Sequence, residues 1–259
     1  MAELLPRTVT VMRYILPLRE GGSLPALAEA DDDFKYVVKF RGSGHGVKML
    51  ISELLGGKIA ELLGLKIPEI VFINLDPEFG ITEGDEEIQD LLKFSQGLNL
   101  GLHYLSGALT YEPSIKIDPL LASKILWLDC YITNIDRTAK NTNLLFWKSE
   151  LWIIDNGASF YFHHSWQNFE QAAKSPFVYS KDHVLLLKAS KLQEVDKWAK
   201  EILTDTKLKE VVDLIPLDWL EWDDTDLSPE EIRKVYLDFF IQRRDHSTNF
   251  VNQAIHARG

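Results

Sequence analysis

The sequence predicts an α+β protein with two lobes, a β-rich first part and a helix-rich second part, with a cleft between them. Short runs of β-branched and aromatic residues dominate up to about residue 108. After that point the apolar residues mostly follow the spacing of amphipathic helices. We therefore expect residues 1–108 to form the first lobe and residues 109–259 the second, with a ligand site in the cleft.

The first lobe is expected to contain several strands and one long helix. The helix is expected over 47–63, although Gly56 and Gly57 each weaken it by about 1 kcal/mol. A shorter helix is expected near 86–94. The segments with strand character are 8–16, a piece ending near 29, 34–40, 69–75 and 98–105.

The second lobe is expected to be mainly helical, with one short hairpin near its start. The hairpin strands are 143–147 and 151–154. Ser228 followed by Pro229 and two glutamates is typical of a helix start. The expected helices are 119–132, 182–189, 191–203, 206–213 and 228–255.

Composition excludes several classes of protein. The 259-residue chain is 46% hydrophobic, which is enough for a sizeable core, and its net charge of −11 gives no general attraction to nucleic acid. The single cysteine, Cys130, excludes an internal disulfide and lies in an apolar run, so we expect a buried thiol. No segment reaches ~18 consecutive apolar residues and the N-terminus does not resemble a secretion signal, so we expect a cytoplasmic protein without a membrane span.

The stretch from Thr133 to Gly157 carries the most informative motif. Phosphoryl transfer requires a carboxylate near the incoming hydroxyl and oxygen ligands for magnesium. Asp136 and Asn141 have the spacing of a kinase catalytic loop, and Asp155 follows the second hairpin strand. The hairpin can bring Asn141 and Asp155 to one end, close enough to share an ion. The alternative is a loop whose Asn and Asp residues only cap helices and turns.

Lys39 and Glu53 extend this motif into the first lobe. Lys39 ends a predicted strand and resembles the kinase lysine that contacts the α- and β-phosphates of ATP. Glu53 lies among apolar residues on the following helix, where its carboxylate can pair with Lys39. The alternatives are a solvated lysine and an exposed helix face.

The order of these features resembles the HipA-like kinase family, whose catalytic loop reads Asp-x-x-Ala-Lys-Asn. Here that loop stands as Asp136-Arg137-Thr138-Ala139-Lys140-Asn141. The resemblance covers roughly residues 35–160, and Asp136-Arg137 also echoes the phosphoinositide kinases. It implies a two-lobed kinase fold that binds ATP and Mg²⁺. Lys39 would contact the phosphates and Glu53 would hold Lys39. Asp136 would act as the catalytic base or orient the acceptor hydroxyl, and Asn141 and Asp155 would bind the metal.

Two glycine-rich loops compete for the role of covering the phosphates. Gly21, Gly22 and Ser23 lie between the first two strands, the position that kinases use, and we favour them. The loop 41–46 is richer in glycine but follows the lysine strand. Its backbone N–H groups are also able to approach an anion.

Other polar residues have two interpretations each. Arg137 either neutralises the transferring phosphoryl group or pairs with a nearby acid. Asn143 is either an additional polar ligand or a turn former. His163 and His164 lack the spacing of metal ligands, so we expect them to be structural or exposed.

The expected function is an ATP- and Mg²⁺-dependent Ser/Thr protein kinase. The alternatives are a kinase of small molecules or lipid head groups and a nucleotide-binding pseudokinase that acts by association. The toxin members of the family carry an extra N-terminal subdomain, for which this chain is too short. Their synthetase substrate and their DNA-binding antitoxin are therefore not transferred to this chain, and an antitoxin-like partner stays an open possibility.

Overall fold

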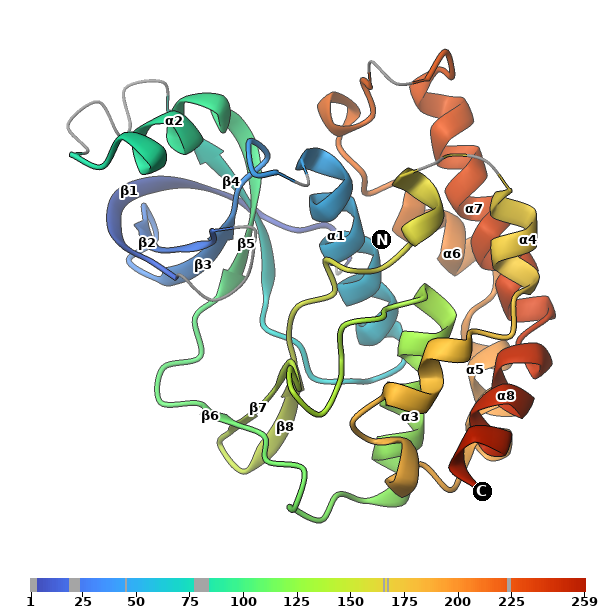
Figure 1. Cartoon of the computed structure of the whole chain (residues 1–259). Coiled ribbons are helices and arrows are strands. Elements are labelled where there is room, and N and C mark those ends of the chain that lie inside the picture. The colour runs from blue at the N-terminus through green and yellow to red at the C-terminus, as the bar shows by residue number, and fades with distance from the viewer. Residues whose placement is uncertain are drawn as a thin grey trace. The chain divides into compact units, whose positions relative to one another are not determined.

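The computed structural model describes residues 4–18, 24–44, 46–76, 84–164, 166, 168–222 and 225–259 (Figure 1). The mixed α+β class predicted from the sequence is confirmed. The chain divides into two compact units, the first made of residues 1–54 and 68–107 and the second of residues 55–67 and 108–259. Residues 55–67 thus group with the second unit, whereas the sequence put them before a division at residue 108. The assignment of kinase lobes stays a prediction.

The first unit is built on a closed five-stranded barrel. Its strand order is β1-β2-β3-β5-β4, and the pairing of β1 with β4 is parallel whereas the other pairings are antiparallel. The strands are β1 (Thr8–Pro17), β2 (Ala26–Ala30), β3 (Lys35–Lys39), β4 (Ile70–Leu75) and β5 (Gly97–His103). Closure of the barrel removes the unpaired edges that an open sheet of this size would expose.

Alternation along the strands fills the barrel with apolar side chains. Tyr36 and Val38 of β3 point into the core, because alternate residues of a strand face the same side. Helix α2 (Glu86–Phe94) contributes Ile88 and Leu92 to the same core. Asp85 caps this helix by accepting hydrogen bonds from two backbone N–H groups of the first turn.

The second unit is organised around helix α3 (Pro119–Ile132), which packs against α5, α7 and α8. All residues from Ile125 to Ile132 are buried, including Cys130, as the sequence predicted. A small sheet contains β6 (Leu109–Thr110), β7 (Leu144–Trp147) and β8 (Glu150–Ile153). The other helices are α4 (Phe169–Lys174), α5 (Leu192–Ile202), α6 (Asp205–Val212), α7 (Pro229–Asp245) and α8 (Thr248–Arg258).

Helix α1 (Gly46–Leu62) contains the boundary between the units, since residues up to Leu54 group with the first and those from Leu55 with the second. The expected helix over 47–63 is thus confirmed despite its two internal glycines. Among the described residues, no helix has both the length and the apolar character needed to cross a bilayer.

Two helix predictions in the second unit are wrong. The segment 182–189 forms no α-helix, because His183 is extended and bridges to Thr138. The segment instead contains the last residue of one short 3₁₀ helix, η2 (Val178–Asp182), and the whole of another, η3 (Leu186–Lys188). The segment 228–255 is two helices, α7 and α8, and Ser247 at the break donates a hydrogen bond from Oγ to Asp196 Oδ1 (2.5 Å). Both errors arise from contacts distant in sequence, which override local helix propensity.

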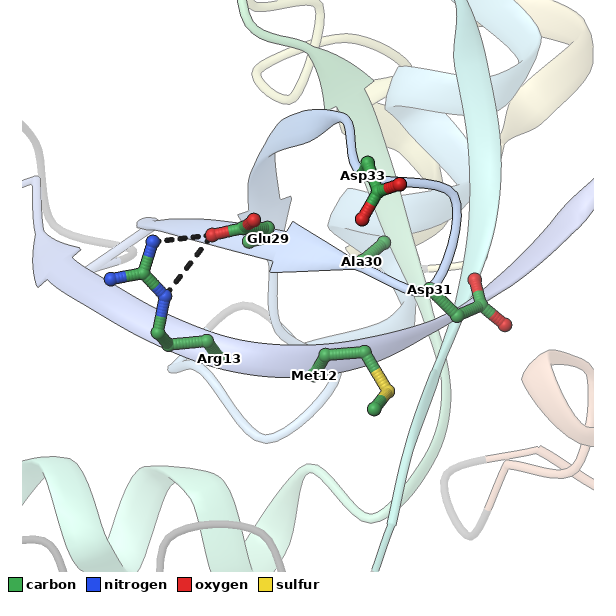
Figure 2. Close-up of a pocket in the computed structure, with 6 residues that line it drawn as sticks. All are labelled: Met12, Arg13, Glu29, Ala30, Asp31 and Asp33. Atoms are coloured by element: carbon green, nitrogen blue, oxygen red, sulfur yellow. Dashed lines mark hydrogen bonds and ion pairs between the residues drawn. The ribbon is translucent and has the colours of Figure 1, made fainter.

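A surface hollow on the first unit lies beside the β1–β2 pair. Figure 2 shows its lining residues, with Arg13 hydrogen-bonded to Glu29 across the two strands. Arg13 lowers the pKa of the Glu29 carboxyl, and Asp31 Oδ1 accepts a hydrogen bond from the backbone N–H of Thr10. These polar groups stabilise the strand pair and its turn, so we assign no ligand to this hollow.

Candidate active site

Lys39 and Glu53 form the ion pair that the sequence predicted. Lys39 ends β3 on the strand face opposite Tyr36 and Val38, and Glu53 lies on α1. The Lys39 side chain is 6% exposed and that of Glu53 is 1% exposed. A buried ion pair is stable only when the two groups have good hydrogen-bonding geometry, because each charge loses its hydration on burial. Both residues belong to the first unit.

The predicted catalytic loop begins where α3 ends. Thr133 terminates the helix with a left-handed backbone (φ 57°). Asn134 then turns the chain: its Nδ2 donates to Asp129 Oδ1 (3.2 Å), while its Oδ1 accepts from the backbone N–H of Asp136 (3.0 Å). The backbone that carries Asp136 is therefore fixed directly to the last turn of a buried helix.

Two asparagine amides hold the Asp136 carboxylate. Asn141 Nδ2 donates to Asp136 Oδ2 at 2.7 Å, and Asn143 Nδ2 donates to the same oxygen at 3.3 Å. Burial and the nearby charge of Asp155 raise the pKa of Asp136, and these effects outweigh the two amide hydrogen bonds. A carboxylate with a raised pKa is a better proton acceptor than an ordinary aspartate, which suits a catalytic base.

Asp155 lies directly beyond β8, at the hairpin end that also carries the catalytic loop. Leu144 pairs with Ile153, and the Ile154 N–H donates to the carbonyl of Asn143 (3.1 Å). Asp155 has a left-handed backbone (φ 56°), as does Asn143 (φ 46°). Such conformations cost non-glycine residues about 1–3 kcal/mol and cluster at functional sites. The structure thus brings together Asp136, Asn141 and Asp155, as predicted.

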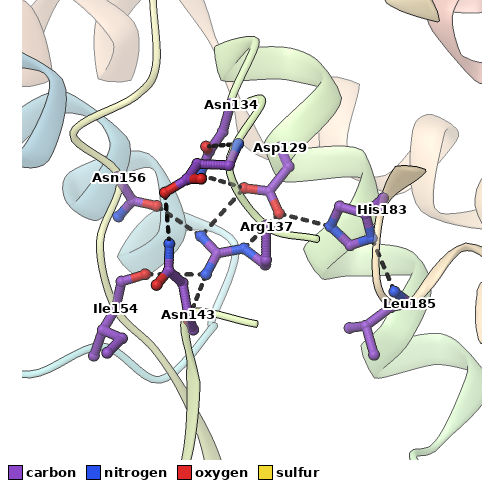
Figure 3. A network of polar contacts seen from close by, with 9 residues as sticks. Asp129, Asn134, Arg137, Asn143, Ile154, Asn156, His183 and Leu185 are labelled. Carbon is purple, nitrogen blue, oxygen red and sulfur yellow. Dashed lines mark hydrogen bonds and ion pairs between the residues drawn. The ribbon is translucent and has the colours of Figure 1, made fainter. Parts of the chain in front are cut away.

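Arg137 is buried at the centre of a polar network that the sequence did not reveal (Figure 3). Its Nε donates to Asp129 Oδ2 at 2.6 Å, and its Nη1 donates to the carbonyls of Asn143 and Ile154. Its Nη2 donates to Asn156 Oδ1 at 3.0 Å. Of the two roles considered for Arg137, pairing with an acid is therefore the observed one, because its side chain is 0% exposed and fully engaged.

Asp129 is the counter-charge of this network. Burial alone would raise the pKa of its carboxyl, but Arg137 and His183 outweigh that effect and the pKa is lowered. His183 Nε2 lies 2.8 Å from Asp129 Oδ2, and the backbone N–H of Leu185 donates to His183 Nδ1 at 3.1 Å. Because Nδ1 accepts from the Leu185 N–H, Nε2 is the ring nitrogen that donates to Asp129.

Residues 11–251 match the sequence pattern of the family described as HipA-like kinase. The chain belongs to the HipA-like kinase family. The resemblance drawn from the Asp136–Asn141 motif is thereby confirmed, and the family supports a kinase-type phosphotransferase.

The fold of this HipA-like kinase also resembles that of a solved kinase. The crystal structure of CtkA, a proinflammatory kinase of Helicobacter pylori, superimposes with a TM-score of 0.58 at 12% sequence identity. The similarity covers 97% of this chain and 98% of that chain. At this identity it shows a shared fold only. No curated protein matches the sequence.

The side-chain oxygens of Asn141 and Asp155 in this HipA-like kinase suit a hard divalent cation. Asn141 uses its amide nitrogen to hold Asp136, which leaves the amide oxygen as a possible ligand. The carboxylate of Asp155 would supply a second. Mg²⁺ prefers such oxygens and completes its shell with water and phosphate, so two protein ligands are sufficient. No group of three or more His, Cys, Asp or Glu side chains suited to a metal ion occurs among the described residues.

The two candidate phosphate loops differ in what the structure reveals. Gly21, Gly22 and Ser23 lie outside the described residues. In the loop 41–46, four backbone N–H groups already donate within the first unit: Arg41 to Asn99 Oδ1, Gly42 to Ser95 Oγ, Ser43 to Phe40 O and Gly46 to Ser43 O. Because these N–H groups already donate hydrogen bonds within the protein, this loop is disfavoured as a phosphate-binding loop.

The residues that sequence reasoning missed are Asp129, Asn134, Asn156 and His183. One clue was available: Asp129 is the only charged residue in the apolar run 125–132. A lone acid inside a buried helix is rarely accommodated without a partner. His163, in contrast, is buried beside the hydroxyl of Tyr236 (2.9 Å), and His164 is exposed, in line with their expected non-catalytic roles.

Gly56 has a packing role that leads to a testable prediction. A Cβ on Gly56 would lie 2.8 Å from the Cβ of Asn156 and 3.2 Å from Cδ1 of Ile132. Alanine usually stabilises a helix interior by about 1 kcal/mol relative to glycine. Here we expect Gly56→Ala to destabilise instead, by about 1–3 kcal/mol, because the added methyl overpacks the site. Urea unfolding checks the sign, and a midpoint above that of the wild type would refute the packing argument.

The buried Lys39–Glu53 pair leads to a second prediction. Lys39→Met leaves the Glu53 charge without this partner. The substitution should lower the free energy of unfolding by about 3–5 kcal/mol. The double variant Lys39→Met with Glu53→Leu should recover most of that loss, because an apolar pair of similar volume replaces the buried charges. Nucleotide turnover should not recover, since the lysine is still missing. Recovery of turnover in the double variant would argue against a phosphate-binding role for Lys39.

Proposed function

We propose that this protein is an ATP- and Mg²⁺-dependent kinase that phosphorylates Ser or Thr hydroxyls of a protein. Lys39 would contact the α- and β-phosphates, with Glu53 as its partner. Asn141 and Asp155 would hold the metal ion, and Asp136 would act as the base. Gly21, Gly22 and Ser23 would cover the phosphates. The bound metal would neutralise charge that develops on the phosphates.

The observation that supports this proposal most strongly is the local arrangement around Asp136. Its carboxylate is oriented by Asn141 and Asn143, and burial, together with the nearby charge of Asp155, raises its pKa. A structural cap would be expected to have a lowered pKa, because its hydrogen bonds would stabilise the charged form. A raised pKa combined with a fixed orientation is characteristic of a group that accepts a proton.

The proposed reaction transfers the γ-phosphoryl group of ATP to the acceptor hydroxyl. The acceptor oxygen bonds to the γ-phosphorus, the bond from that phosphorus to the bridging oxygen breaks, and ADP leaves. The hydroxyl proton passes to Asp136. Lys39 favours the reaction by neutralising phosphate charge, while Asn141 keeps the Asp136 carboxylate oriented.

The acceptor is tested by incubating the protein with γ-labelled ATP, Mg²⁺ and a cell lysate. Labelling of a discrete lysate protein, or of the enzyme itself on Ser or Thr, is expected. ATP consumption stimulated by one member of a metabolite or lipid-head-group panel, without protein labelling, would favour the small-molecule alternative. Nucleotide binding without any turnover would favour a pseudokinase. Asp136→Ala controls for contaminating kinases.

A further inference from the structure

We propose that Arg137 is a positioning residue that fixes the metal ligand Asp155 relative to the base Asp136. This inference rests on the proposed function, since it assigns those roles to the two aspartates. Arg137 follows Asp136 directly in the chain, while its guanidinium bonds to residues on both sides of Asp155. One side chain therefore connects the catalytic loop to the turn that carries the metal ligand (Figure 3).

The contacts of Arg137 act on the strained part of the backbone. The carbonyl of Ile154, which accepts from Arg137 Nη1 at 3.0 Å, belongs to the peptide unit that enters Asp155. The carbonyl of Asn143 accepts from the same nitrogen. Asp155 and Asn143 both have positive φ angles, which surrounding contacts must maintain. Without the guanidinium, the turn around Asp155 would lose two hydrogen bonds that hold this conformation, those to the Ile154 carbonyl and to Asn156 Oδ1.

The buried partners of Arg137 keep its guanidinium in one orientation. Asp129 engages Nε and Nη2, and His183 and Asn134 engage the same carboxylate. Because Asp129 lies on α3, the orientation is set by the core of the second unit. Groups that orient metal ligands without touching the metal typically alter metal affinity by roughly 10–100-fold when they are replaced.

Arg243 offers a matched control for a merely structural role. Like Arg137 it is buried and donates to several backbone carbonyls, here those of Cys130, Ala172, Ala173 and Ser175. None of these carbonyls belongs to the loops 133–143 or 154–157. Removing either guanidinium should therefore destabilise the fold, whereas only Arg137 should affect the metal site.

The test compares Arg137→Lys and Arg243→Lys with the wild type. Mn²⁺ binding in the presence of ADP is measured by electron paramagnetic resonance, and Tm by calorimetry. We expect both variants to have a lower Tm than the wild type. Arg137→Lys should raise the Kd for Mn²⁺ by roughly 10–100-fold, whereas Arg243→Lys should leave it within about twofold. The Mg²⁺ concentration for half-maximal turnover should shift in parallel, and high Mg²⁺ should restore part of kcat.

Equal metal affinity in Arg137→Lys and the wild type would overturn the inference, as would an equal loss in Arg243→Lys. If Arg137→Lys fails to fold, Asp129→Asn tests the same orientation without a change in volume. It should weaken Mn²⁺ binding in the same direction, and an unchanged Kd would again overturn the inference. A wild type that binds Mn²⁺–ADP but never turns over ATP would refute the proposed function while leaving the positioning role measurable.

Discussion

Asp155→Asn is expected to lower the kcat of metal-dependent ATP turnover by roughly 10²–10³-fold, the scale set by loss of one preorganised electrostatic contact. The substitution keeps the shape of the side chain but removes its negative charge, which is what a divalent cation requires from a carboxylate ligand. The left-handed backbone at this position (φ 56°) favours Asn among the possible replacements, since Asn adopts it readily. The fold should therefore be retained.

The measurement for Asp155→Asn is turnover against Mg²⁺ concentration, together with Tm. Asp90→Asn on α2 is a suitable control, because it removes an exposed carboxylate of the first unit. The control should behave as the wild type. If Asp155→Asn kept the wild-type kcat and the wild-type Mg²⁺ dependence, Asp155 would not be a metal ligand.

Asp136→Asn is expected to remove activity and to raise Tm at neutral pH. Loss of a general base costs about 10²–10⁴-fold in rate. The gain in stability follows from the raised pKa of Asp136, which means that the folded protein disfavours the charged carboxylate. Asn141 and Asn143 retain an amide oxygen to bond to. Each kcal/mol gained should raise Tm by about 2–4 °C for a chain of this size.

The pH dependence of this effect provides the check. Since the pKa of Asp136 is higher in the folded than in the unfolded chain, the folded state binds more protons between the two values. Wild-type stability is therefore undiminished below the ordinary value of 3.8 and falls as pH rises through the folded pKa. The Tm difference between Asp136→Asn and the wild type should be largest at neutral pH and should shrink as pH approaches 3.8. A less stable variant at pH 7 would contradict this account.

The parts of the site that are close along the chain can be predicted from local sequence patterns. Asp136 and Asn141 share one loop, and a short hairpin leads from that loop to Asp155. Hairpin pairing is set by local strand and turn preferences, so the spacing alone predicts that these residues meet. Lys39 and Glu53 are 14 residues apart, on a strand and the next helix, and their pairing was likewise predictable.

The contacts between residues far apart along the chain become visible only in the three-dimensional fold. Asp129 and His183 are 54 residues apart, and their contact belongs to the network that gives Arg137 a buried partner instead of a phosphate. The bridge of the same histidine to Thr138, 45 residues away, interrupts the helix expected over 182–189. The approach of Gly56 to Asn156, and the parallel closure of β1 on β4, also join distant segments. Such contacts depend on how whole elements pack and on which buried charges find partners, and local sequence preferences do not encode either.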